Sequence, residues 1–145
     1  MAYTRIENTF VIRLDKGEEI MEALRKFCYL LAIASGSFTA IGAVEKATIS
    51  FFEPEKKKFS SKEFTGNYEI VSLTGNISQM RREPYLHCHV IISDNAFCVF
   101  GGHLKTAIVS TTCEIILMKL PVVVERKYND DIGLNLLHFG TGSAL

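Results

Sequence analysis

The sequence predicts an α+β domain in which one main N-terminal helix packs on a mostly antiparallel, strongly bent β-sheet. Three observations support this prediction. Apolar residues recur at helical spacing in one early segment, from Ile20 to Leu31. From Phe38 onward, runs rich in β-branched and aromatic residues alternate with short turn signals. The length of 145 residues, with 48% hydrophobic residues, fits one compact domain with a sizeable core.

The first elements follow from local signals. Residues Thr9 to Leu14 alternate apolar and polar and predict a strand. Asp15 is the expected N-cap of the helix, because it is followed by acidic residues that favour the positive end of the helix dipole. The helix is expected to continue to about Ala34, where Ser35-Gly36-Ser37 would end it.

The rest of the chain is expected to be almost entirely β. The first predicted strand is long and should bend near Gly42, and Glu53-Pro54-Glu55-Lys56 and Ser93-Asp94-Asn95 are expected to be hairpin turns. The predicted strands are Phe38–Phe52, Lys57–Phe64, Asn67–Ile77, Tyr85–Ile92, Phe97–His103, Ile108–Leu117 and Val122–Lys127.

The whole chain, 1–145, is expected to form a single domain with a core at about 9–139. The apolar segment 132–137 should dock on the body, and residues 140–145 should be frayed. Apolar residues occur on both faces of several predicted strands, for example Phe97-Cys98-Val99-Phe100. One face would pack on the helix and the other on something else, for which a partner subunit is an economical candidate.

Charge and cysteine content narrow the function classes. Lys plus Arg and Asp plus Glu both total 16, so the chain lacks the overall basic excess of a protein that grips phosphates. Local basic patches remain at Lys56-Lys57-Lys58, expected at a solvated hairpin tip, and at Arg81-Arg82. The four cysteines, at 28, 88, 98 and 113, lie in apolar runs and are expected to be buried thiols in a reducing compartment. With a polar N-terminus and no membrane-length apolar stretch, a cytoplasmic location is expected.

Three of the four histidines fall within a short stretch of the sequence: His87, His89 and His103. On a strand, residues two apart point to the same face, so His87 and His89 project side by side and Cys88 points away. A third imidazole from the next strand would complete the ligand set of a zinc ion that keeps one position open.

The hairpin register decides whether the imidazoles meet. A two-residue turn would turn His103 to the wrong face, whereas a three-residue turn, Asp94 to Ala96, would place it opposite His87 and place Gly101 opposite His89. A bulge at Gly101-Gly102 would also restore the parity. The alternative interpretation is that the histidines are half-buried sheet residues with ordinary hydrogen bonds.

Other candidate residues carry weaker signals. Glu69 is a candidate general base if it reaches the cluster. Arg13 and Glu45 interrupt apolar strands and could pair with each other or with Glu69. His138, in the tail, is expected to be structural. The glycines form no phosphate-binding loop, because none opens a helix after a strand.

Several motifs in this order resemble the plant and prokaryote conserved (PPC) domain. They are Gly42-Ala43-Val44, the run from Gly66 through Tyr68-Glu69-Ile70 to Gly75-Asn76, then His87-Cys88-His89 and Gly101-Gly102-His103-Leu104. The resemblance extends roughly from Thr9 to Phe139. It implies a largely antiparallel sheet with a helix, assembled as a homotrimer.

The resemblance also bears on function. Plant members carry an AT-hook before the domain, whereas prokaryotic members are usually the domain alone and are commonly described as predicted DNA-binding proteins. This chain has no Arg-Gly-Arg core and has Asn67-Tyr68-Glu69 where the plant motif has Arg-Phe-Glu. In prokaryotic members similar histidines can hold a metal, so the resemblance agrees with the strand argument.

Two functional hypotheses remain open at this point. The first is a stand-alone, metal-binding homotrimer that acts as a regulatory protein with DNA or protein partners. The second is a metal-dependent enzyme or small-molecule-binding protein in which His87, His89 and His103 hold a divalent ion, with zinc the first expectation. A third role for the metal, purely structural, would require a fourth protein ligand.

Overall fold

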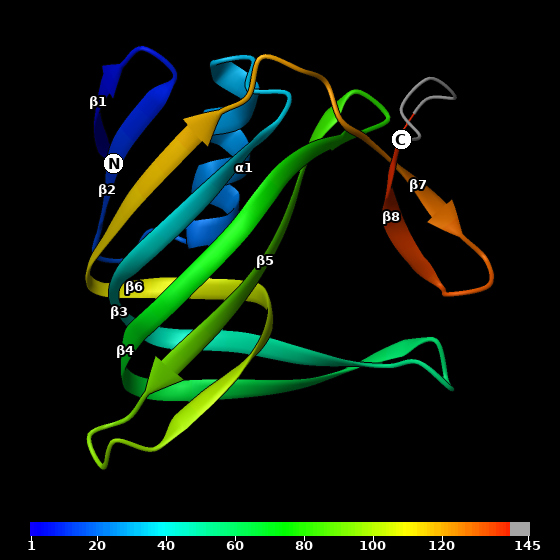
Figure 1. Cartoon of the computed structure of the whole chain (residues 1–145). Coiled ribbons are helices and arrows are strands. Elements are labelled where there is room, and N and C mark those ends of the chain that lie inside the picture. The colour runs from blue at the N-terminus through cyan, green and yellow to red at the C-terminus, as the bar shows by residue number, and fades with distance from the viewer. Residues whose placement is uncertain (140–145) are drawn as a thin grey trace.

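The computed structural model describes residues 1–139, which form one helix and eight strands (Figure 1). The elements are β1 (Ala2–Ile6), β2 (Thr9–Asp15), α1 (Ile20–Leu30), β3 (Gly36–Glu53), β4 (Lys58–Met80), β5 (Glu83–Ser93), β6 (Val99–Lys119), β7 (Glu125–Asn129) and β8 (Leu134–His138). The frayed end expected at 140–145 lies outside the described residues.

All the strands belong to one sheet, with the order β1-β2-β6-β3-β4-β7-β8, and β5 pairs with both β4 and β6. Among residues 1–139, every strand pairing is antiparallel except a single parallel contact between β4 and β7, at Gln79 and Glu125. Because β3 lies between β4 and β6 while β5 bridges the same two strands, the sheet curls strongly at this end. The predicted fold class, a mostly antiparallel bent sheet with one N-terminal helix, is confirmed.

The bend in β3 occurs where the sequence predicted it. The pairing shifts register on both sides of Gly42, which has a φ of +150°. A Cβ there would lie 2.2 Å from the carbonyl oxygen of Thr112, so only glycine allows β6 to approach this closely. The sequence predicted two strands, Lys57–Phe64 and Asn67–Ile77, where the structure has the continuous β4, and two, Phe97–His103 and Ile108–Leu117, where it has the continuous β6. These predicted breaks are wrong, because β-bulges shift the register there and the strands bend without ending.

The N- and C-terminal strands differ from the prediction. Strand β1 was not predicted, and it forms a hairpin with β2. The segment 132–137 was expected only to dock, but most of it forms β8, which pairs with β7 in a second hairpin. In this hairpin β7 begins at Glu125, later than the strand predicted from Val122.

The helix begins later than predicted, with Glu19 rather than Asp15 as its N-cap. The Glu19 carboxylate accepts hydrogen bonds from the backbone N–H groups of Met21 (3.1 Å) and Glu22 (2.7 Å). It also accepts one from the N–H of Ala107 on β6 (2.8 Å), so one side chain caps the helix and ties it to the sheet.

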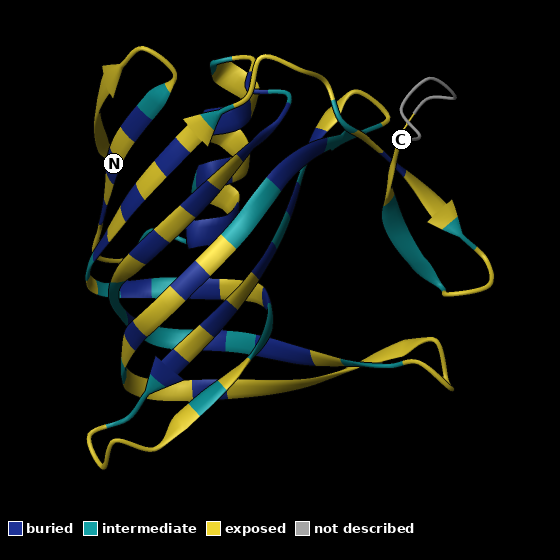
Figure 2. Ribbon diagram, in the orientation of Figure 1, coloured by how far each residue is buried: buried dark blue, intermediate teal, exposed yellow. Residues whose placement is uncertain are grey.

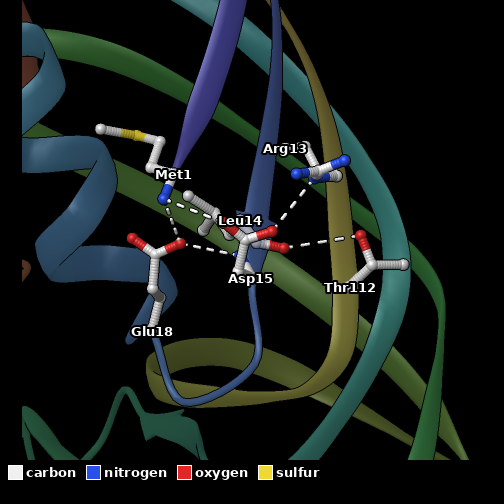
Figure 3. A network of polar contacts seen from close by, with 6 residues as sticks. All are labelled: Met1, Arg13, Leu14, Asp15, Glu18 and Thr112. Carbon is white, nitrogen blue, oxygen red and sulfur yellow. Dashed lines mark hydrogen bonds and ion pairs between the residues drawn. The ribbon is translucent and has the colours of Figure 1, made fainter.

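Asp15 instead ends β2 and takes part in a polar network (Figure 3). The amino group of Met1 lies 3.2 Å from the Asp15 carboxylate and 2.8 Å from that of Glu18. The Glu18 carboxylate accepts a hydrogen bond from the N–H of Asp15 (2.7 Å), which closes the turn between β2 and α1. Arg13 pairs with Asp15 at 3.1 Å, so the expected pairing of Arg13 with Glu45 or Glu69 is wrong.

The core lies between α1 and one face of the sheet. Buried residues alternate with more exposed ones along β2, β5 and the second half of β6, so each of these segments turns one face to the core (Figure 2). Helix residues Ile20, Leu24 and Phe27 are buried against this inner face. Within residues 1–139, no helix combines the length and hydropathy needed to span a bilayer.

Candidate metal centre

Three imidazoles meet on the outer face of the sheet, away from α1. His87 and His89 project side by side from β5, and His103 projects from β6. The ring centroids are 5.3 Å apart for His87 and His89, 5.0 Å for His87 and His103, and 5.6 Å for His89 and His103. One ring nitrogen from each lies within 4.8 Å of the other two.

The register that brings them together differs from both predicted turns. His89, not His87, lies opposite His103, and Ile91 lies opposite Gly101. The connection runs over five residues, Asp94 to Cys98, because Ser93 pairs with Val99. Compared with the register predicted for a three-residue turn, the observed pairing of β5 with β6 is shifted by two residues. Because side chains alternate along a strand, a shift by an even number of residues keeps each side chain on the same face of the sheet. The cluster therefore forms although the predicted pairing was wrong.

The opposite face of β5 confirms the predicted alternation. Cys88, between the two histidines, is buried, and its Sγ lies 3.3 Å from the Sδ of Met21 on α1. The thiol is thus in the core and does not belong to the imidazole cluster.

His103 is fixed between two strands, since it pairs with His89 on one side and with Ser50 of β3 on the other. A Cβ on the preceding residue, Gly102, would lie 2.8 Å from the carbonyl oxygen of Ser50. Glycine at this position therefore permits the close approach of β3 that places His103. The centre of the Phe59 ring lies 5.1 Å from the centre of the His103 imidazole, so the phenyl ring packs beside it.

The three side chains fit a metal ion by chemistry and by spacing. In a tetrahedral zinc site with Zn–N distances of about 2.0–2.1 Å, ligand nitrogens are about 3.3 Å apart. Nitrogens within 4.8 Å of one another need only small side-chain rotations to reach this spacing. Among residues 1–139, no fourth His, Cys, Asp or Glu joins the cluster. A bound ion would therefore keep at least one position open for water or a ligand.

The electrostatics of the cluster favour uncharged imidazoles. Burial, together with the charges of the neighbouring His87 and His89, lowers the pKa of His103 to about 4. The pKa of His87 is also lowered, first by burial and then by the charge of Arg126. A neutral imidazole keeps the nitrogen lone pair that a metal needs.

A cavity of about 490 Å³ opens over the imidazoles. The β3–β4 hairpin lines one side with aromatic rings, and the β7–β8 hairpin lines the other. The Nζ of Lys57, near the tip of the first hairpin, donates a hydrogen bond to the carbonyl oxygen of Asp130 in the second (2.7 Å). The lining residues are Ser50, Phe51, Phe52, Phe59, Tyr85, His87, His89, Gly102, His103, Arg126, Tyr128, Gly133, Leu134, Asn135 and Leu136.

Sequence reasoning missed the contribution of the β7–β8 hairpin. Arg126 on β7 is 8% exposed and lines the cavity with the three histidines. Nothing in the sequence around Arg126 indicates that it lines the cavity. The β7–β8 hairpin reaches the cavity only because β7 pairs with β4, which is distant in the sequence.

The remaining candidate residues do not join the cavity. Glu69 is exposed on β4 opposite Ser93, and it is not among the residues that line the cavity. The structure therefore does not place it as a general base at the imidazoles. His138 is exposed on β8, opposite Glu125. The basic residues at 56–58 lie at an exposed hairpin turn, as predicted.

A single helix on a bent antiparallel sheet, with three imidazoles under a cavity on the outer face, defines a small β-sheet protein with a three-histidine centre. The sequence profile described as the Plants and Prokaryotes Conserved (PCC) domain, the family written PPC above, matches residues 1–121. The chain belongs to this family. The match ends before the β7–β8 hairpin.

Solved structures support the same assignment. A "putative dna binding protein" from Bacteroides thetaiotaomicron is 36% identical over 95% of this chain and 96% of its own, with a TM-score of 0.93. A metal-containing protein from Archaeoglobus fulgidus is 32% identical over 96% and 99%, with a TM-score of 0.87. A plant- and prokaryote-conserved protein from Pyrococcus horikoshii is 32% identical over 95% and 94%, with a TM-score of 0.85. No curated protein matches the chain.

Proposed function

We propose that this protein binds a divalent metal ion at His87, His89 and His103, and that the ion binds a small molecule in the cavity above it. The observation that carries the proposal is the convergence of three ring nitrogens, all within 4.8 Å of one another, on a cavity of about 490 Å³. The relative from Archaeoglobus fulgidus, described as metal-containing, supports a metal in this chain too.

Zinc is the first candidate ion, because three imidazoles with an open position form one of its common ligand sets, although imidazole also suits other divalent ions. When bound, such an ion polarises a carbonyl group or lowers the pKa of a bound water to about 7. The chain's own residues would hold the ion and screen the cavity from bulk water with the Phe59 and Tyr128 rings. This arrangement suits small-molecule binding and a metal-dependent reaction.

Elemental analysis of the purified protein tests the proposal. We expect about one metal ion per chain, and its loss in His87→Ala and His103→Ala. His138→Ala is the matched control, because this exposed imidazole lies outside the cluster, and it should keep the metal. Wild-type protein that carries no metal and takes up none when zinc is added would refute the metal centre.

A second candidate function is regulation through DNA binding, which the description of the relative from Bacteroides thetaiotaomicron favours. The formal net charge of zero predicts that binding is weak and depends strongly on salt, since it would rest on phosphate contacts alone. The exposed lysines at 56–58 and Arg81-Arg82 are the candidate contacts. A fluorescence-polarisation titration at low salt that gives no binding at tens of micromolar protein would reject this function.

We also propose that the protein assembles as a homotrimer. An apolar patch on the outer face of the sheet supports an interface between subunits. It consists of Val11, Ile41, Ile116 and Met118, which have exposed fractions between 42% and 60%. Val11 lies opposite Ile116 across β2 and β6, so the patch is continuous over neighbouring strands.

A cytoplasmic location agrees with the state of the cysteines. All four are free thiols, and none is paired in a disulfide. Cys28, Cys88 and Cys113 are buried as predicted, whereas Cys98 is exposed, so its predicted burial is wrong. Cys98 is exposed because it ends the turn after β5 and does not reach the core.

A further inference from the structure

Arg126 is a buried cation surrounded by neutral partners. Its Nε donates a hydrogen bond to the Oγ of Ser78 (2.8 Å), its Nη1 to the carbonyl oxygen of Asn135 (2.6 Å), and its Nη2 to the Oδ1 of Asn76 (2.8 Å). The guanidinium carbon also lies 4.8 Å from the centre of the Tyr85 ring. These contacts orient the group firmly, but none of them neutralises its charge.

No ion pair among residues 1–139 includes Arg126. A guanidinium stays charged under all ordinary conditions, and a buried charge without a counter-charge is costly. Arginine has five N–H donors, and the three hydrogen bonds leave two of them free for a further acceptor. The residue therefore has both the charge and the donors to bind an anion.

The guanidinium lies beside the histidine cluster. Asn76, which accepts its Nη2 bond, is the cross-strand partner of His87. Arg126 lines the same cavity as His87, His89 and His103. Its charge lowers the pKa of both His87 and His103, as expected for a cation close to them.

The rest of the cavity wall is largely apolar. Phe51, Phe52 and Phe59 line it from the β3–β4 hairpin, and Leu134 and Leu136 line it from β8. A molecule bound in the cavity would therefore contact the Arg126 guanidinium and the proposed metal centre at one end, and apolar side chains along the walls. Inorganic phosphate would leave these walls without a partner, whereas an organic acid would use both.

The geometry points to a carboxylate subsite at Arg126: the guanidinium binds the carboxylate of a small organic acid, whose apolar part packs against the hairpins and whose far end faces the three imidazoles. The planar fork of arginine N–H groups matches the two oxygens of a carboxylate. The contact at the imidazoles rests on the metal centre proposed above, whereas the contact at Arg126 does not.

A titration of the wild-type protein with matched ligands tests the subsite without any variant. Benzoate and benzamide have the same shape and differ in charge, and binding can be followed by NMR on metal-loaded and metal-free protein. We expect benzoate to bind at least tenfold more tightly than benzamide or inorganic phosphate. Equal binding of benzoate and benzamide, tighter binding of phosphate, or no benzoate-dependent shift at millimolar concentration would each overturn the proposal.

Arg126→Gln removes the charge and should weaken benzoate binding by roughly tenfold to a hundredfold, as expected for a hydrogen bond to a charged group, and should leave benzamide binding unchanged. Lys127→Gln is the matched control, because Lys127 is the exposed neighbour on the same strand. Hydrogen exchange of the β7–β8 amides reports whether the hairpin remains folded in each variant. If benzoate binds Arg126→Gln as tightly as wild type, Arg126 only anchors the hairpin and the subsite is rejected.

The same titration separates this subsite from the metal centre. His87→Ala, which should lack metal by elemental analysis, is expected to retain charge-selective benzoate binding that disappears on the further change Arg126→Gln. Metal uptake without charge-selective binding would reject only the subsite. Charge-selective binding without metal uptake would reject only the metal centre.

Discussion

His89 lies directly opposite His103 across the antiparallel β5–β6 pair, with the ring centroids 5.6 Å apart. The five-residue turn before β6 sets this register. The Asp94 carboxylate accepts hydrogen bonds from the N–H groups of Ala96 and Cys98, both at 2.9 Å. The backbone of Asp94 also bonds with that of Cys98 (3.1 Å) and Phe97 (3.0 Å), so one residue organises the whole connection.

Asp94→Ala should therefore loosen the turn and, with it, the alignment of His103. The variant leaves two N–H groups without their acceptor, and we expect it to lose about 1–2 kcal/mol of unfolding free energy and to bind metal more weakly. Urea denaturation and a zinc titration measure the two effects. Asn95→Ala, at the exposed neighbouring position, is the control. Wild-type stability and metal affinity in Asp94→Ala would show that the strands alone fix the register.

Acid should destabilise the metal-free protein through His103. Its pKa is lowered to about 4, mainly by burial and then by His87, His89, Lys105 and Arg126, whereas an unperturbed histidine titrates at 6.5. Between these values the unfolded chain binds a proton that the folded chain does not, so stability falls as the pH drops from about 6.5 to about 4. Urea midpoints at pH 7.5 and pH 5 measure the loss.

The variant His103→Asn should show a smaller loss between the two pH values, because it removes the group that titrates. His138→Asn should behave like the wild type, since that imidazole is exposed at the end of β8. An equal pH dependence in the wild type and His103→Asn would assign the acid sensitivity to other groups.

Native thiol labelling should find a single reactive cysteine. Burial raises the pKa of Cys28, Cys88 and Cys113 to about 12, which leaves almost no thiolate at pH 8 and no access for a reagent. Cys98 is exposed. We expect Ellman's reagent to label one thiol per chain in the folded protein, none in Cys98→Ser, and all four only after denaturation. Rapid labelling of a second thiol in the native protein would contradict the burial of Cys28, Cys88 and Cys113.

The sequence predicts the residues of the centre better than their pairing. The alternation of β5 is a local property, so the side-by-side projection of His87 and His89 and the inward turn of Cys88 follow from the sequence. The register of His103 depends on the Asp94 turn, whose five-residue form requires Phe97 at a φ of +61°, a conformation that its sequence does not indicate. Glu19 was missed as the N-cap because one of its hydrogen bonds comes from Ala107, far along the chain.

Arg126 is the clearest example of a site residue whose position could not be predicted from the sequence. Each of its hydrogen-bond partners lies on β4 or β8, and the cavity wall that it forms exists only after the C-terminal hairpin has paired with the sheet. Neither periodicity nor a local motif encodes that contact. The bend at Gly42 was predictable for the opposite reason, since a glycine within an apolar strand is itself a local signal.

A charged residue in the apolar patch on the outer face tests whether this patch is the interface between subunits. If Val11, Ile41, Ile116 and Met118 meet a second copy of the chain, Ile116→Asp would bury an unpaired carboxylate in the interface and should dissociate the assembly. Light scattering should give three times the chain mass of 16.2 kDa for the wild type and a single chain mass for Ile116→Asp. Tyr29→Asp, which changes a more exposed aromatic residue on α1, should remain trimeric. A monomeric wild type would reject the trimer, and a trimeric Ile116→Asp would move the interface away from this face.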